Sequence, residues 1–174
     1  RYNSSLDMRF DDKDDSLTAQ EIIENSSVRD LTNIFNEFGE ERNSFRIARA
    51  IKESNEEINA DTLVSIISRK TAYKYRIKTY SRIFQALRIK TNNELDHLES
   101  FLNDFINFLN PGGRIVIISY HSMEDRMVKH KFKDLKLNKE LQVLSKKPFT
   151  PTDEEIFDNK RSRSAKMRVG EKIG

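Results

Sequence analysis

The sequence predicts an α/β protein in which short helices precede a strand, a polar corner and a further helix. Pro111-Gly112-Gly113 is a turn signal, because glycine adopts positive φ at little cost. The run Ile115-Val116-Ile117-Ile118 follows it and is apolar on both faces, as expected of a strand buried in a parallel sheet. Residues 17–69, in contrast, show helical periodicity without a strand signal.

The polar corner is the candidate functional site. Ser122 is the expected N-cap of the helix that follows, and Glu124 and Asp125 fall in its first turn, where acidic side chains are favoured. Ligands of open α/β sheets bind beyond the carboxyl ends of strands. His121 with these acids permits acid–base chemistry, but the same residues equally suit a structural corner. Their spacing provides too few convergent ligands for a metal site.

The amino-terminal helices are predicted from capping and periodicity. Thr18-Ala19-Gln20-Glu21 has the spacing of a capping box. Residues 28–38 place their apolar side chains on one face, and Gly39 can end that helix. Residues 42–54 repeat the pattern, and Asp61 is the expected cap of a fourth helix.

The later elements are less regular. Residues 80–109 predict a long helix that is broken near Thr91-Asn92-Asn93. Residues 141–144 predict a strand and residues 152–157 a short helix. The alternation of apolar side chains over residues 165–169 predicts an edge strand.

Composition excludes several classes of protein. The 174 residues suffice for one medium domain, or for a domain with a smaller insert. The absence of cysteine excludes disulfides, thiolate metal sites and cysteine nucleophiles. No apolar run approaches the roughly 20 residues of a membrane span, and no signal-peptide pattern opens the sequence. We therefore expect a cytoplasmic protein without membrane contact.

Positive charge is concentrated in two places. Residues 126–174 contain 14 Lys and Arg against 7 Asp and Glu, which favours a polyanionic partner such as RNA. A solvated basic surface explains this equally well. Arg42, Arg46 and Arg49 form a second basic stripe, and residues 70–79 interleave basic side chains with two tyrosines. That segment suits RNA contact or an ordinary connector with extended basic side chains.

Several motifs occur in an order that resembles one known family. They are Leu6-Asp7-Met8-Arg9, Gly39-Glu40-Glu41-Arg42, Arg46-Ile47-Ala48-Arg49-Ala50-Ile51, Phe84-Gln85-Ala86-Leu87-Arg88-Ile89, Asn93-Glu94-Leu95, Gly112-Gly113-Arg114, Ser119-Tyr120-His121-Ser122-Met123-Glu124-Asp125-Arg126 and Asn159-Lys160-Arg161-Ser162-Arg163-Ser164. Together they resemble the bacterial 16S rRNA cytosine-N4 methyltransferase family, also called the MraW family.

The resemblance implies a Rossmann-like, S-adenosylmethionine-dependent methyltransferase with an all-α inserted domain. Residues 1–10 and 80–174 would form part of the catalytic core, with 113–119 as a parallel strand, and residues 11–79 the substrate-recognition insert. The family's glycine-rich cofactor part is missing, so we expect a carboxyl-terminal portion that has no cofactor-binding residue and is inactive alone. We then expect either a partner chain, such as a second copy in a homo-oligomer, to cover the exposed sheet edge, or a substantially rearranged core.

The resemblance also implies roles for individual residues. Asp7 and Arg9 would border the target base, and His121, Ser122, Glu124 and Asp125 would line the other side of the cleft. The partner would be 16S rRNA or the small ribosomal subunit, contacted by Arg42, Arg46, Arg49, Lys74, Arg76, Arg126, Asn159, Arg161 and Arg163.

Alternatives to these roles stay open. Arg9 and Arg126 would instead form ion pairs with Asp7 or Asp125 that hold the corner together. Methylation at cytosine N4 needs no covalent intermediate, in agreement with the absence of cysteine, whereas methylation at carbon 5 is disfavoured. A different class of function is a non-catalytic helical RNA-binding module or an assembly fragment.

Overall fold

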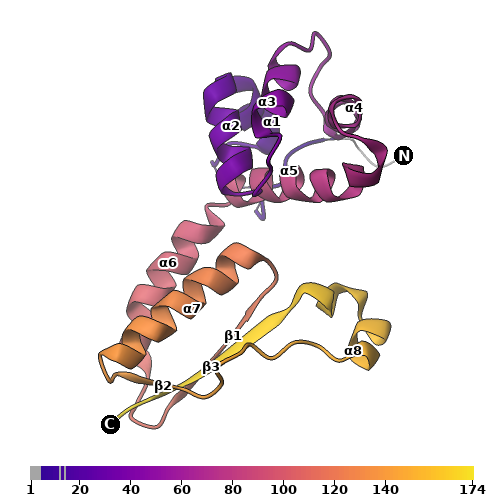
Figure 1. Ribbon diagram of the computed structural model, residues 1–174. Coiled ribbons are helices and arrows are strands. Elements are labelled where there is room, and N and C mark those ends of the chain that lie inside the picture. The colour runs from indigo at the N-terminus through magenta and orange to yellow at the C-terminus, as the bar shows by residue number, and fades with distance from the viewer. Residues whose placement is uncertain (1–4, 12, 14) are drawn as a thin grey trace. The chain divides into compact units, whose positions relative to one another are not determined.

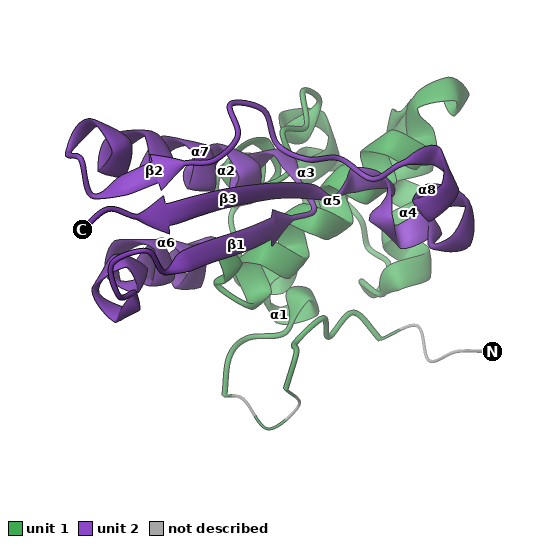
Figure 2. Cartoon of the chain, turned by 90° about the horizontal axis from the view of Figure 1, so that it is seen from below, with its two compact units in different colours: residues 1–94 green, residues 95–174 purple. Residues whose placement is uncertain are grey.

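The computed structural model describes residues 5–11, 13 and 15–174. Contacts divide the chain into two compact units, residues 1–94 and residues 95–174 (Figure 2). Each unit has its own hydrophobic core. The division between an insert at 11–79 and a catalytic core, which the family resemblance implies, stays a prediction. Among the described residues, no helix has both the length and the apolar character that a membrane crossing requires.

The first unit is helical (Figure 1). Its elements are α1 (Ala19–Asn25), α2 (Val28–Glu37), α3 (Ser44–Lys52), α4 (Ala60–Lys70), the 3₁₀ turn η1 (Tyr73–Tyr75) and α5 (Arg76–Thr91).

Capping residues set the starts of these helices. The capping box between Thr18 and Glu21 is confirmed. Asn59, not Asp61, caps α4, and its side chain accepts a hydrogen bond from the Thr62 N–H at 3.0 Å. The prediction for Asp61 was wrong because the helix starts at Ala60, so that Asp61 already lies in its first turn.

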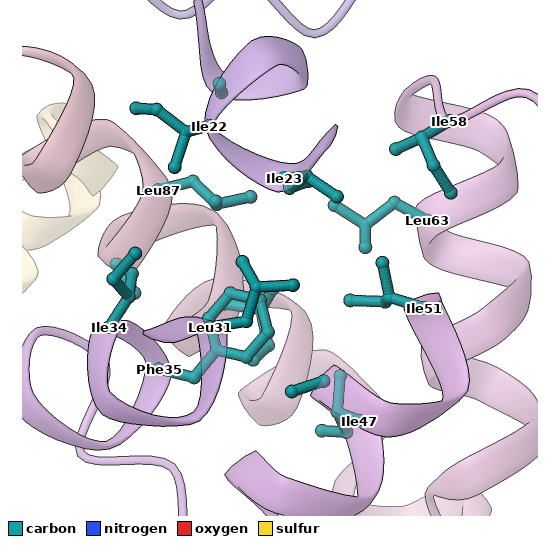
Figure 3. Close-up of a cluster of buried hydrophobic side chains, with 14 of the residues drawn as sticks. Ile22, Ile23, Leu31, Ile34, Phe35, Ile47, Ile51, Ile58, Leu63 and Leu87 are labelled. Carbon is teal, nitrogen blue, oxygen red and sulfur yellow. The ribbon is translucent and has the colours of Figure 1, made fainter. Parts of the chain in front are cut away.

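The core of the first unit is formed by apolar faces of α1 to α5 (Figure 3). Leu31, Phe35, Ile47, Leu63 and Leu87 are completely buried. Figure 3 shows their side chains converging between the surrounding helices. The amphipathic pattern of the sequence is therefore satisfied within this unit.

Gly39 allows the chain to pass close to α5. A Cβ atom at this position would lie 2.7 Å from the carbonyl oxygens of both Phe35 and Arg82. Contacts that short do not occur, so only glycine fits without a backbone shift. The glycine follows α2 as predicted, and it brings the segment that precedes α3 against α5.

The second unit combines helices with a small sheet (Figure 1). Its elements are α6 (Glu94–Asp104), which begins at the boundary residue, η2 (Phe105–Phe108), β1 (Arg114–Ser119), α7 (Ser122–Leu137), β2 (Leu141–Val143), α8 (Asp153–Asp158), η3 (Lys160–Ser164) and β3 (Lys166–Lys172). The predicted break before α6 is confirmed, and Asn93 there has a φ of 47°.

The sheet corrects two predictions. Its strand order is β1-β3-β2 and both pairings are antiparallel, so the expected parallel neighbours of β1 are not found in the described residues. The strand predicted over 165–169 is the central β3, not an edge strand. Alternating apolar residues identify a half-buried strand but do not specify how many neighbours it pairs with or in which direction they run.

Only one face of β1 is covered in the described residues. Ile115 and Ile117 pack against the core that α6, η2 and α7 supply. Val116 and Ile118 point to the other face and are 54% and 53% exposed. The prediction that both faces are buried is therefore wrong for these residues, because the described helices of this unit cover one face alone.

Candidate functional site at the end of strand β1

The corner between β1 and α7 is built by a reciprocal capping box. His121, not Ser122, is the N-cap, and its Nδ1 accepts a hydrogen bond from the Glu124 N–H at 3.4 Å. In return, Glu124 Oε2 accepts from the backbone N–H groups of Tyr120 at 2.8 Å and His121 at 3.3 Å. The prediction for Ser122 was wrong because His121 has an extended backbone and its ring accepts the hydrogen bond from the Glu124 N–H, which is the role that a serine cap usually fills.

This arrangement orients the imidazole. Since Nδ1 accepts a hydrogen bond, the neutral ring carries its proton on Nε2, which lies 3.3 Å from Glu124 Oε1. The His121 side chain is 6% exposed, whereas that of Glu124 is 24% exposed. Glu124 is thus the more accessible member of the pair.

Glu124 is ionised at neutral pH. Burial by itself raises the pKa of this carboxyl group, but contact with the His121 side chain and the hydrogen bond from the Tyr120 N–H outweigh it. The net effect places the pKa of Glu124 below its ordinary value. The corner therefore presents a fixed carboxylate that can accept a proton or a hydrogen bond.

Asp125 holds α7 to the sheet. Its carboxylate accepts two hydrogen bonds from Arg168, from Nε at 2.7 Å and from Nη2 at 3.2 Å, while Lys166 Nζ lies 3.4 Å away. Burial raises the pKa of Asp125, but the hydrogen bonds and charge of Arg168, with the charge of Lys166, bring it below the ordinary value. Arg168 is thus a buried ion-pair partner of Asp125, and the alternative in which Arg126 forms an ion pair at this corner stays a prediction.

Arg168 and Lys166 were missed by sequence reasoning. They lie opposite Ile117 and Ser119 in the β1–β3 register, so both project from the face that carries α7. The sequence indicates only that these two residues are two positions apart in a strand, so that their side chains lie on the same face of the sheet. Only the pairing of two distant segments identifies their acidic partner.

Asp7 and Arg9 form the predicted alternative, an ion pair. Arg9 donates from Nε and Nη2 to the two Asp7 carboxylate oxygens at 2.7 and 2.9 Å. The side-chain hydrogen bond from Arg9 outweighs burial and lowers the pKa of Asp7. Asn92 anchors this loop by accepting from the Phe10 N–H at 2.8 Å and donating to the Met8 carbonyl at 2.9 Å.

The ion pair belongs to the first unit and the β1–α7 corner to the second. That the two border one cleft stays a prediction. The Asn92 anchor was not foreseen, because a loop and a helix end 82 residues apart in sequence give no local signal of their contact.

The predicted RNA-binding residues of the first unit are exposed except Arg76, which is half-buried and donates from Nε to the Thr71 carbonyl at 3.2 Å. Arg42, Arg46 and Arg49 lie on α3 or just before it, although Arg49 pairs with Glu53 at 2.6 Å. Lys74 and Arg76 follow α4, and their cationic groups lie 4.9 and 5.6 Å from the ring centres of Tyr75 and Tyr73, respectively. This unit therefore combines basic groups with accessible aromatic rings.

The predicted residues of the carboxyl-terminal segment are also exposed. Arg126 lies on α7, and Arg161 and Arg163 lie in η3. Asn159 precedes η3, where its side chain accepts a hydrogen bond from the Arg161 N–H at 3.1 Å. The sequence Asn-Lys-Arg-Ser-Arg-Ser thus forms a tight turn that presents two arginines to solvent.

Comparison with known proteins identifies the family of this chain. The family model described as the MraW methylase family matches residues 1–173, and the chain belongs to this family. The sequence-based recognition is thereby confirmed.

Similar curated proteins carry the name "Ribosomal RNA small subunit methyltransferase H". Those of Nostoc sp. (strain PCC 7120 / SAG 25.82 / UTEX 2576) and Trichodesmium erythraeum (strain IMS101) are 47% and 45% identical over 99% of this chain. That of Nostoc punctiforme (strain ATCC 29133 / PCC 73102) is 48% identical over the same share. The chain spans 57%, 61% and 58% of the lengths of these three relatives.

The methyl donor implied by the family, S-adenosylmethionine, does not fit the glycines of the described residues. A glycine-rich turn directly after a strand is the usual cradle of such a ligand in doubly wound folds. Here the glycines at 112 and 113 precede β1, and Gly170 lies inside β3, where a Cβ would approach Leu141 Cδ2 to 2.6 Å. These glycines serve a turn and close packing, so we assign no donor-binding residue.

Proposed function

We propose that this chain contributes to an enzyme that methylates the exocyclic amine, N4, of a cytidine in 16S ribosomal RNA, with S-adenosylmethionine as the methyl donor. The observation that carries the proposal is the family match, which extends over both compact units. The names of the relatives, matched over 99% of the chain, support ribosomal RNA as the substrate. The N4 position and the donor rest on the family resemblance.

The chemistry of the acceptor explains what the β1–α7 corner would contribute. The lone pair of the cytosine amine is delocalised into the ring, so the amine must be positioned accurately and its proton accepted. Glu124 is suited to accept that proton, because its carboxylate is ionised, partly exposed and fixed by two backbone N–H groups. His121, which is more buried, acts in this proposal as the residue that positions Glu124.

The other candidate residues take supporting roles in the proposal. Ser122 is exposed at the first residue of α7, whereas Asp125 fixes the helix through Arg168. Asp7 and Arg9 would border the target base from the first unit. The exposed basic side chains at Arg126, Arg161 and Arg163, with Asn159, would contact the RNA backbone.

A non-catalytic RNA-binding module or assembly fragment is less well supported. The relatives match essentially all of this chain and are named as methyltransferases. The exposed apolar face at Val116 and Ile118 agrees with the proposal that a further chain segment or a partner chain covers this sheet.

A hybrid protein tests the function. In it, the part of the Nostoc sp. enzyme that this chain does not match completes the present sequence. The hybrid is incubated with S-adenosylmethionine and unmodified small ribosomal subunits, and the nucleosides of the 16S RNA are analysed by mass spectrometry. We expect N4-methylcytidine. Methylation at another cytosine atom, or none by a folded hybrid, contradicts the proposal.

Glu124→Gln tests the role of the corner. Glutamine keeps an oxygen that can accept the two backbone hydrogen bonds, but it loses the acceptor that faces His121 Nε2 and it accepts a proton poorly. The rate should fall by about 10² or more, as expected for loss of an acid–base group. Glu154→Gln, an exposed acid in α8, is the matched control. An unchanged rate in Glu124→Gln, or in His121→Ala and Asp7→Ala with unchanged RNA affinity, would refute the assigned roles.

A further inference from the structure

A cavity of about 360 Å³ lies within the first unit, between the segment that precedes α3 and the amino-terminal part of α5. This volume falls in the range of small-ligand pockets, about 300–1,000 Å³. Its walls carry Arg42, Asn43, Tyr75, Lys78, Thr79 and Arg82, with Glu41 at one side. Lys78 and Arg82 were not among the residues predicted from the sequence to bind RNA.

A buried carboxylate orders the cavity wall. Glu41 is 2% exposed, its Oε1 accepts from the Asn43 N–H at 2.9 Å, and its Oε2 lies 3.5 Å from Arg82 Nη1. The close approach that Gly39 permits places this segment against α5. The Arg82 side chain, 29% exposed, is thereby tethered at one end and accessible to the cavity.

The cations of the cavity and its tyrosine favour an anion that carries a flat ring. Arg42, Lys78 and Arg82 provide three cations, whereas the single carboxylate of Glu41 is buried and paired with Arg82. Tyr75 is 55% exposed and presents an aromatic ring at the same cavity. Arginine and lysine with an accessible tyrosine are the groups that bind the phosphate and stack on the base of single-stranded RNA.

We infer that this cavity binds one unpaired nucleotide of an RNA strand, with its phosphate among Arg42, Lys78 and Arg82 and its base stacked on Tyr75. A base inside a duplex is stacked on its neighbours and cannot lie on the tyrosine, so the site selects an unpaired segment. The inference rests on the proposed RNA substrate and specifies where, and in which form, the first unit holds it.

The phosphate half of the inference is tested by RNA binding to the 174-residue chain. The probe is a fluorescein-labelled, unstructured 12-nucleotide RNA, and its dissociation constant is measured by anisotropy over a series of salt concentrations. Lys78→Gln should weaken binding and reduce the slope of log K against log salt by about 0.7, the loss of one single-strand phosphate contact. Arg29→Gln, which removes an exposed charge on α2 of the same unit, should leave the slope unchanged.

The stacking half is tested at Tyr75. Tyr75→Ala should weaken binding about tenfold, a loss typical of one base–aromatic stack, whereas Tyr75→Phe should retain wild-type affinity. Arg82→Lys keeps the charge beside Glu41 and should preserve most of the affinity, while Arg82→Gln should not. Thermal unfolding of each variant separates loss of binding from loss of fold.

Two outcomes overturn the inference. In one, Lys78→Gln and Arg29→Gln have the same affinity and salt slope, which identifies a diffuse basic surface. In the other, Tyr75→Ala binds as tightly as Tyr75→Phe. Either result, obtained while the hybrid still forms N4-methylcytidine, refutes the inference that the cavity binds a nucleotide and leaves the proposed function intact. The expected binding pattern without methylation by the hybrid refutes the proposed function alone.

Discussion

Removing the Asp125 carboxylate should destabilise the second unit strongly. Asp125→Ala leaves Arg168, whose side chain is 9% exposed, without its two charge-assisted hydrogen bonds. A guanidinium group cannot avoid the cost of an unpaired buried charge by losing its proton. Lys166 adds a second positive charge, since its Nζ lies 3.4 Å from the Asp125 Oδ2 that the substitution removes. Breaking a buried ion pair from one side costs about 3–5 kcal/mol, a large share of the about 5–15 kcal/mol by which typical domains are stable.

The sheet offers a matched control. Glu171→Ala also removes the acidic partner of an arginine, Arg114, which Glu171 contacts at 2.7 Å. The Arg114 side chain is 67% exposed, so water replaces the lost partner and the expected cost is at most about 1 kcal/mol. The two variants thus differ mainly in the burial of the arginine that is left behind.

Urea unfolding followed by hydrogen exchange provides the assay. Peptides that cover β1 and β3 report the free energy of unfolding of the second unit, and peptides from α2 and α3 serve as an internal reference. The expected difference between the two variants is about 2–5 kcal/mol in the second unit. A difference below about 1 kcal/mol would show that the Asp125–Arg168 pair contributes no more than a surface pair, which would refute the reasoning.

Three further predictions follow from pH, packing and the helical core. The pKa of Asp125 is lowered in the folded state, so its contribution to the free energy of unfolding is complete above its unfolded pKa of about 3.9 and is lost as the pH falls through the folded pKa. The difference in free energy of unfolding between wild type and Asp125→Ala, measured by urea unfolding, should therefore be constant above about pH 5 and shrink below about pH 4. A constant difference down to pH 2 would exclude this linkage. Gly170→Ala should cost about 1–3 kcal/mol and lower the melting temperature, since its Cβ would lie 2.6 Å from Leu141 Cδ2; an unchanged melting temperature would mean that Leu141 moves aside freely. Phe35→Ala should cost about 3–5 kcal/mol in the first unit, because its side chain is completely buried, and exchange of α2 amides should report it; protection equal to that of wild type would contradict the assigned core.

Much of the helical architecture could be predicted because its signals are local. The Thr18–Glu21 capping box and the break at Asn92-Asn93 each depend on side chains within a few residues of the backbone groups that they affect. The strand over 141–144 and the helix over 152–157 were found in nearly the same places. The caps at Asn59 and His121 were misassigned by one or two residues, since several neighbouring polar side chains can reach the same donors.

The candidate site was predicted in its position but not in its connections. His121, Glu124 and Asp125 do form the corner after β1. Arg168, which decides what Asp125 does, lies 43 residues further along the chain, and no local pattern identifies it. The same holds for the Arg82 and Glu41 pair, whose members are separated by 41 residues.

The sequence by itself determined which segments of the first unit are helical, the β1 strand with its polar corner, and membership of the MraW methylase family, because these depend on periodicity and on motifs that are contiguous in the chain. Tertiary structure decided the antiparallel order of the sheet, which face of β1 is covered, and which charges become partners. Those features depend on burial and on contacts between distant segments, and both arise only when the apolar faces pack. Asp125 illustrates the division: its place in the first turn of α7 is local, whereas its buried partner is set by the β1–β3 register.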